Sequence, residues 1–114
     1  AASLLSGCHD LAVVEALTGL LSVHEEAIRW TAAMALVPSG RPAAEALLRR
    51  IVTRELVPEM RHVSAYVLRH VPDEALRYTV APVVQALDAS TYRIETPPAA
   101  EAALRRLSHW KVLL

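Results

Sequence analysis

Five histidines are the residues of this 114-residue chain whose chemistry could support a metal site or acid–base catalysis. His62 and His70 fall on one predicted helix, eight residues apart, which separates them by about 12 Å along the helix axis. One metal ion cannot bridge that distance, and no His-x-x-x-His pair occurs in the sequence. We therefore interpret the histidines as surface residues or as contacts between helices, and we expect no metal site.

A second candidate for chemistry is the pair formed by Cys8 and His9, because an imidazolium beside a thiol can lower the thiol pKa. Neighbouring residues in a terminal coil seldom hold that geometry, so we interpret Cys8 as incidental. A single Cys leaves no partner for an internal disulfide and favours a reducing compartment, so we expect a cytoplasmic protein. The sequence also lacks a Gly-rich phosphate loop, a nucleophile elbow and a Cys-x-x-Cys pair. We expect no catalytic residue and no cofactor.

The charge balance argues against nucleic acid and membrane partners. Twelve basic and twelve acidic residues give a formal net charge of zero, whereas nucleic-acid binding usually needs a basic excess. The most basic spots, Arg49-Arg50 and Arg105-Arg106, are small. No apolar run approaches the ~18 residues of a membrane span, and the first residues lack the basic region of a signal peptide.

Apolar periodicity predicts an all-α chain, in agreement with its 54% apolar content and only three glycines. The predicted helices span residues 10–21, 25–36, 42–53, 58–71, 80–87 and 97–110, or five to six helices in all. Asp10 and Thr96 are expected to cap the first and the last of them, and Pro42 and Pro58 to open the third and fourth. Pro82 is expected to interrupt a helix, which leaves residues 74–78 as a short turn and 88–96 as a loop. Residues 1–9 would be a flexible segment, and residues 10–114 a single domain.

Two of the predicted helices carry a well-defined inner stripe. That of helix 25–36 comprises Ile28, Thr31, Ala32, Ala35 and Leu36. That of helix 58–71 comprises Met60, Val63, Ser64, Val67, Leu68 and Val71.

A motif recurs at a distance of 32 residues. Residues 28–36 read IRWTAAMAL and residues 60–68 read MRHVSAYVL, so both follow an apolar–Arg–x–x–small–Ala–x–x–Leu pattern. The alternate helices are also related, since residues 12–17, 42–47 and 82–87 read AVVEAL, PAAEAL and PVVQAL. Residues 98–106 (PAAEAALRR) repeat residues 42–50 (PAAEALLRR). Two alternating helix families are typical of stacked helical repeats.

This alternation resembles the HEAT-repeat family, most closely its short bacterial variety, over roughly residues 10 to 88. The resemblance implies an α-solenoid of antiparallel helix pairs, a HEAT-like superhelix of about two and a half pairs. Helices 25–36 and 58–71 would then lie on the convex side, and helices 10–21, 42–53 and 80–87 would line the concave side. The final helix would be a cap, or a concave-side helix without its outer partner.

Known members of the family suggest enzymatic alternatives. Deoxyhypusine hydroxylase is a HEAT-repeat enzyme that binds iron through His-Glu pairs at similar helix positions. In this chain the residue after His62 is Val63, and the residue equivalent to His62 in the first copy of the motif is Trp30. The one His-Glu pair, His24-Glu25, precedes its helix. Bilin lyases also carry these repeats, so an enzyme accessory that holds a small molecule in its groove remains an alternative. HEAT-like DNA glycosylases line a positive groove with aromatic and acidic residues, and this chain shows no such alignment.

Four polar residues form the first candidate binding site. Glu15, Glu45 and Gln85 occupy equivalent positions on the predicted concave side, and Arg49 joins them. This mixed lining suits a peptide with both charges better than a phosphate backbone. We therefore predict a non-enzymatic module or scaffold that binds a protein or peptide partner, with nucleic acid as a weaker alternative. Uncovered repeat ends would also permit self-association.

The second candidate site is a stripe of Trp30 and Met34, with their equivalents His62 and Tyr66, beside the core stripe. We expect this stripe to pack between repeats. The alternative is that Trp30 and Tyr66 are partly exposed and anchor a protein partner.

Two arginines, Arg29 and Arg61, occupy equivalent positions in the repeated motif. We expect them to pair with nearby acidic residues, Glu25 or Glu26 for the first and the Pro58-Glu59 turn for the second. The alternative is a ladder that binds acidic groups of a partner.

Overall fold

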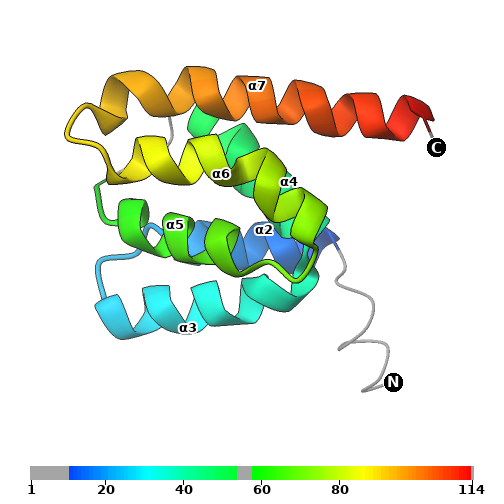
Figure 1. Ribbon diagram of the computed structural model, residues 1–114. Helices are drawn as coiled ribbons and strands as arrows, with labels where there is room; N and C mark the ends of the chain where they lie inside the picture. The colour runs from blue at the N-terminus through cyan, green and yellow to red at the C-terminus, as the bar shows by residue number, and fades with distance from the viewer. Residues whose placement is uncertain (1–10, 54–57, 114) are drawn as a thin grey trace, which may run out of the picture.

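The chain is all-α. The computed structural model describes residues 11–53 and 58–113, and within these ranges it contains six α-helices, one short 3₁₀ helix and no strand (Figure 1). The elements are α2 (Leu11–Leu20), α3 (Glu26–Leu36), η1 (Val37–Ser39), α4 (Arg41–Val52), α5 (Met60–His70), α6 (Glu74–Asp88) and α7 (Tyr92–Leu113). The predicted all-α class is thus confirmed. Asp10 and the Cys8–His9 pair lie outside the described residues.

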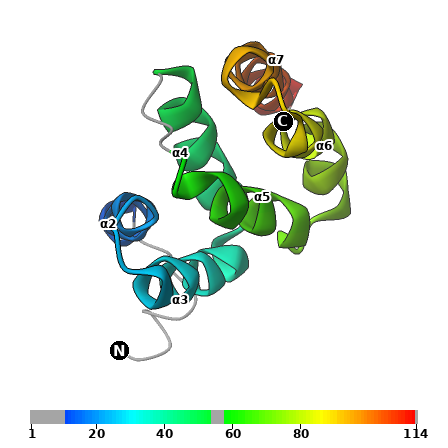
Figure 2. The same cartoon turned by 90° about the vertical axis from the view of Figure 1, so that its left-hand side faces the viewer.

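The helices form two rows. In one row α4 packs between α2 and α7, and in the other α5 packs between α3 and α6 (Figure 2). The rows are joined through the α2–α3 and α6–α7 hairpins, whereas α4 and α5 have little mutual contact. The core lies between the rows and consists almost entirely of Leu, Val, Ala and Ile side chains.

The predicted stripe of α5 is confirmed in full. Met60, Val63, Ser64, Val67, Leu68 and Val71 are all buried. In α3 only Ala32 and Leu36 of the predicted stripe are buried, together with Ala33. Ile28, Thr31 and Ala35 are exposed, because α3 stands at the end of its row and no described element covers that side.

The helix ends follow local chemistry in two clear cases. Asp73 caps α6, since its Oδ1 accepts hydrogen bonds from the backbone N–H groups of Ala75 and Leu76, at 2.9 and 3.3 Å. Gly40 precedes α4 at φ 64° and ψ −125°, a conformation that L side chains rarely adopt.

Two predicted breaks are wrong. α6 continues through Pro82, and α7 begins at Tyr92 and passes through Pro97 and Pro98, where a loop and a Thr96 cap were expected. A proline inside a helix removes one backbone hydrogen bond at a cost of up to ~3 kcal/mol. Val80 and Val83 on either side of Pro82 are fully buried, so packing outweighs that loss and keeps α6 in one piece.

The structure also reveals a third copy of the Arg motif, which sequence reasoning missed. Residues 71–81 (VPDEALRYTVA) match residues 23–33 (VHEEAIRWTAA), and this third copy lies on α6 in the same row as α3 and α5. The predicted equivalence of residues 80–87 with α2 and α4 is therefore wrong. α7, which carries the PAAEAALRR copy, occupies the row of α2 and α4 instead. In the first two helix pairs the earlier helix belongs to the row of α2 and α4. In the last pair the order is reversed, because the earlier helix, α6, belongs to the row of α3 and α5.

Candidate functional site

Three of the predicted polar residues do come together, in one ion network on α2 and α4. Glu45 accepts from Arg41, with 2.7 Å between Oε2 and Nε, and its Oε1 lies 3.7 Å from Nη1 of Arg49. Nη2 of Arg49 lies 3.9 Å from Oε1 of Glu15. Because α2 and α4 are neighbours in one row, the network links two adjacent helices.

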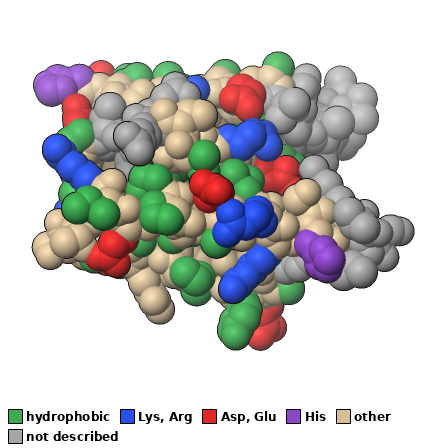
Figure 3. All heavy atoms as spheres, turned by 90° about the horizontal axis from the view of Figure 1, so that it is seen from above, with side chains coloured by type: hydrophobic (Ala, Val, Ile, Leu, Met, Phe, Trp, Pro, Cys, Tyr) green, Lys and Arg blue, Asp and Glu red, His purple; other side chains and the backbone are tan. Residues whose placement is uncertain are grey.

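This network chiefly ties helices together. Glu45, only 14% exposed in its side chain, is the shielded centre, whereas Arg49 is half exposed. Arg41 also donates to the Leu107 carbonyl of α7, so the network reaches all three helices of the row. Acidic and basic side chains are interspersed over the face seen from above, with no large patch of one sign (Figure 3).

Gln85 does not join this network. It lies exposed on α6, which belongs to the other row, so its predicted register with Glu15 and Glu45 is wrong. The corresponding place on α7 is taken by Glu101, which pairs with Arg105 at 3.0 Å. This Glu101–Arg105 pair repeats the Glu45–Arg49 pair of α4, four residues apart in each helix.

The aromatic residues form a second assembly, which we call the aromatic cluster: Trp30 of α3 with Tyr66 and His70 of α5. The rings of Trp30 and Tyr66 meet edge to face, with centroids 5.4 Å apart and an interplanar angle of 84°. Tyr66 and His70 stack at 4.3 Å, and Nδ1 of His70 lies 2.9 Å from the Tyr66 carbonyl oxygen. Edge-to-face and offset stacking are the favoured geometries of such rings.

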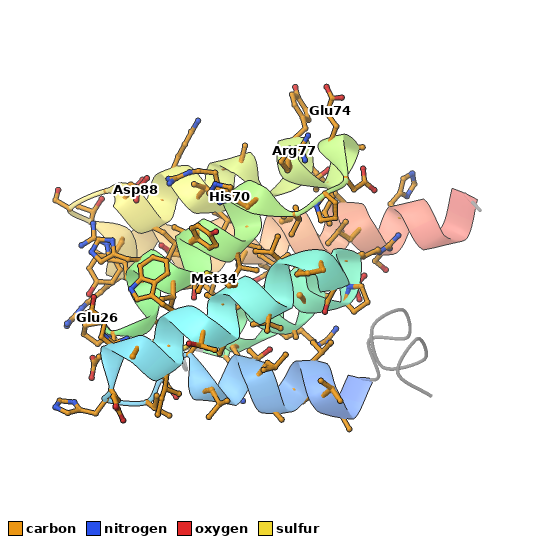
Figure 4. The ribbon with its side chains drawn as sticks, turned by 90° about the horizontal axis from the view of Figure 1, so that it is seen from below. Glu26, Met34, His70, Glu74, Arg77 and Asp88 are labelled. Atoms are coloured by element: carbon orange, nitrogen blue, oxygen red, sulfur yellow. The ribbon has the colours of Figure 1, made fainter. Side chains whose placement is uncertain are left out.

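The aromatic cluster is packed between helices and is also partly exposed, so both expectations for the predicted stripe apply to it. Trp30 and Tyr66 pack against the core between α3 and α5, yet both remain partly exposed. His70 is exposed, and Met34, one turn after Trp30, is 55% exposed on the same side of the molecule (Figure 4). The cluster is therefore both an inter-helix contact and a surface that a partner can reach.

An open groove of 410 Å³ runs beside Trp30 between the N-terminal ends of α3 and α5; we call it the α3–α5 groove. Its lining residues are Glu26, Arg29, Trp30, Pro58, Glu59, His62 and Val63. Glu26, Glu59 and His62 are exposed, and the partly exposed Trp30 is the largest apolar side chain of the lining. Sequence reasoning identified Trp30 and His62 but not the groove, because the alignment of α3 beside α5 brings Glu26 and Glu59 to one place.

The repeated arginines bind backbone carbonyls. Nη1 of Arg29 donates to the carbonyls of Val23 and His24 at 2.9 and 2.8 Å. In the third copy, Arg77 makes the equivalent bond to the Val71 carbonyl at 2.6 Å. Arg29 and Arg77 thus share one role, which is to hold the segment that leads into their helix. The expected pairing of the Arg29 side chain with Glu25 or Glu26 is not what the structure shows.

Arg61 reaches farther along the chain. It donates to the carbonyls of Leu87 and Ala89, and its guanidinium lies over the ring of Tyr92. Arg93 contacts the same Tyr92 ring, and its Nε donates a hydrogen bond to the Tyr92 hydroxyl at 3.3 Å. This hydrogen bond and the charge on the Tyr92 oxygen raise the pKa of Arg93. The Arg61 guanidinium is thus occupied at the α6–α7 turn, whereas the backbone N–H of Arg61 donates to the Pro58 carbonyl at 3.2 Å.

The described residues contain no group of three or more His, Cys, Asp and Glu side chains arranged to hold a metal ion. Among the same residues, no helix combines the length and the apolar character needed to cross a bilayer. Comparison of the chain with protein-family models, with curated proteins and with solved structures finds no match.

Proposed function

We propose that this chain is a short HEAT-like α-solenoid that works as a protein-interaction module. Three observations support the architecture: three copies of the Arg motif share one row, three helices of the PAAEAL type share the other, and the rows pack side by side. A repeat array of this kind offers an extended surface for a partner.

The observation that carries the binding proposal is the α3–α5 groove beside a partly exposed Trp30. Trp and Tyr dominate the energetics of protein interfaces, because they bury a large area at a small cost in conformational entropy. The charged lining of the groove is mostly acidic. A peptide segment that places an apolar side chain on Trp30 and a basic side chain near Glu26 and Glu59 matches this chemistry.

The polar network is the less suitable of the two predicted sites. The charges of Glu15 and Glu45 are already compensated by Arg41 and Arg49, and Glu45 is shielded from solvent. A ligand would have to break these pairs before it could use them. We therefore assign binding to the α3–α5 groove and a structural role to the network.

A random peptide library displayed on phage and selected against the purified chain tests this proposal. We expect enriched peptides to combine an apolar or aromatic residue with Arg or Lys. Calorimetry with the strongest synthetic peptide should show at least a tenfold weaker affinity for Trp30→Ala and for Glu59→Arg, a groove variant that leaves the core intact. Tyr78→Ala, which removes an 80% exposed aromatic ring from α6, serves as the matched control.

Circular dichroism of each variant separates loss of binding from loss of fold. Peptides that bind Trp30→Ala and Glu59→Arg as tightly as the unmodified chain would refute the groove as the binding site. A selection that enriches no peptide would count against the interaction module itself.

A further inference from the structure

One end of the two rows carries an apolar surface that no helix among the described residues covers, which we call the α2–α3 face. It consists of Val13, Ala16, Leu17 and Leu20 on α2 and of Ala27, Ile28, Thr31 and Ala35 on α3. A hollow of 240 Å³ lies between the two helices, and its lining is almost wholly apolar. Leu20 and Ile28, two of its largest side chains, are each 39% exposed. No residue of the face is charged.

The repeated motif shows that this exposure is exceptional. The first, fourth and eighth positions of the motif are Ile28, Thr31 and Ala35 in α3, Met60, Val63 and Val67 in α5, and Leu76, Thr79 and Val83 in α6. All six residues on α5 and α6 are buried. Their three counterparts on α3 are exposed. In α5 and α6 these positions are covered by neighbouring helices, and in α3 they are not.

The partner helix α2 repeats this relationship in the other row. Val13 and Ala16 are exposed on α2, with Val13 at 47%, whereas their equivalents on α4, Ala43 and Ala46, are buried. Both helices of the first hairpin therefore present a surface of the kind that the chain elsewhere covers with another hairpin. The α2–α3 face is therefore equivalent to the surfaces through which neighbouring helices stack on one another within each row.

The opposite end of the rows does not complement this face. There a hollow beside α6 and α7 is lined by Glu74, Tyr78 and Arg106 among others, so this surface carries charged side chains. Head-to-tail stacking of two copies would bury these charges against Leu20 and Ile28, and burying unpaired charges is costly. The polar end behaves as a cap of the array, and the apolar end does not.

We propose that the α2–α3 face binds the α2–α3 face of a second copy of this chain and forms a twofold-symmetric dimer. Such an isologous contact brings two uncharged surfaces together and opposes no like charges. Two helices about 16 Å long and ~10 Å wide project only about 300 Å². Stable interfaces bury about 800 Å² per partner, so this dimer belongs to the weak, transient class.

Sedimentation velocity of the full chain, from about 1 µM to about 500 µM, covers the range in which a weak homodimer forms. We expect the weight-average mass to rise from monomer to dimer with concentration. Ile28→Glu and, independently, Leu20→Glu should lower the association constant at least tenfold. Met34→Glu is the matched control, because Met34 lies on α3 and is more exposed than Ile28 but lies outside the face.

A chain that stays monomeric throughout this range overturns the proposal, as does a dimer that Ile28→Glu and Leu20→Glu leave unchanged. The experiment reports on self-association alone, so its failure leaves the proposed α3–α5 groove to be decided by the peptide selection.

Discussion

The guanidinium carbon of Arg61 lies 4.3 Å from the centroid of the Tyr92 ring, so that a side chain of α5 covers the first residue of α7. The same guanidinium donates to the Ala89 carbonyl at 3.1 Å and to the Leu87 carbonyl at the end of α6. One residue therefore fastens three helices at the point where the chain turns back. This contact supports the reversed order of the last hairpin, because it links α5 to the turn between α6 and α7.

Replacement of Arg61 should therefore destabilise the whole fold. Hydrogen bonds from a charged donor contribute about 1.5–3 kcal/mol, and a cation–π contact at a partly exposed site adds about 0.5–1 kcal/mol. We expect Arg61→Ala to lower the free energy of unfolding by about 2–3 kcal/mol, measured by urea denaturation monitored by circular dichroism. Arg93→Ala removes an exposed arginine from the same ring, and we expect a change within about 0.5 kcal/mol. Equal effects of the two substitutions would contradict the role assigned to Arg61.

A buried hydroxyl on α5 offers a stabilising substitution. Oγ of Ser64 is buried without a hydrogen-bond partner in the described part of the chain, and the equivalent residues of the other two copies are Ala32 and Val80. A buried unsatisfied polar group costs about 1–3 kcal/mol. We expect Ser64→Ala to raise the free energy of unfolding by about 1 kcal/mol, measured by urea denaturation.

The control for Ser64 is Thr18, whose buried hydroxyl does have a partner. Its Oγ1 donates to the Val14 carbonyl at 2.6 Å. Thr18→Val keeps the shape and removes this bond, so it should lower the free energy of unfolding by about 0.5–1.5 kcal/mol. A loss of stability in both variants would mean that the Ser64 hydroxyl is satisfied in solution.

Sequence reasoning succeeded where interactions are local. The stripe of α5 follows from helical periodicity alone, because residues three and four apart share one helix face. The start of α4 near Pro42 follows from the preference of proline for the first turn of a helix. Each of these features depends on neighbours within one turn, and each was predicted correctly.

The errors arose where distant segments decide the outcome. The third Arg motif follows the second by 16 residues, where 32 separate the first two, so the change of spacing and Pro82 concealed it. The contacts of Arg41 with Leu107 and of Arg61 with Leu87 span 66 and 26 residues. No local pattern signals such contacts. Gln85 was placed beside Glu45 for the same reason, because the order in which helices enter the rows is a tertiary property.

Two glycines on the first row should respond to alanine in opposite directions. Gly19 lies inside α2 with ordinary helical geometry, and an added Cβ would meet only the Arg50 side chain at 3.6 Å. Gly40 has open space around it but a φ of 64°, and its carbonyl accepts the first backbone hydrogen bond of α4, from Ala44 at 3.0 Å. Space therefore permits both substitutions, and backbone conformation distinguishes them.

We expect Gly19→Ala to stabilise the chain by about 0.5–1 kcal/mol, since alanine is the better helix former. Gly40→Ala should destabilise it by about 1–2 kcal/mol, because the added Cβ clashes with its own backbone at positive φ. Thermal unfolding should show melting temperatures displaced in opposite directions by several degrees. If Gly40→Ala has no effect, α4 can begin with an extended residue at position 40, and the sharp turn after η1 would not be needed to align α4 with α2.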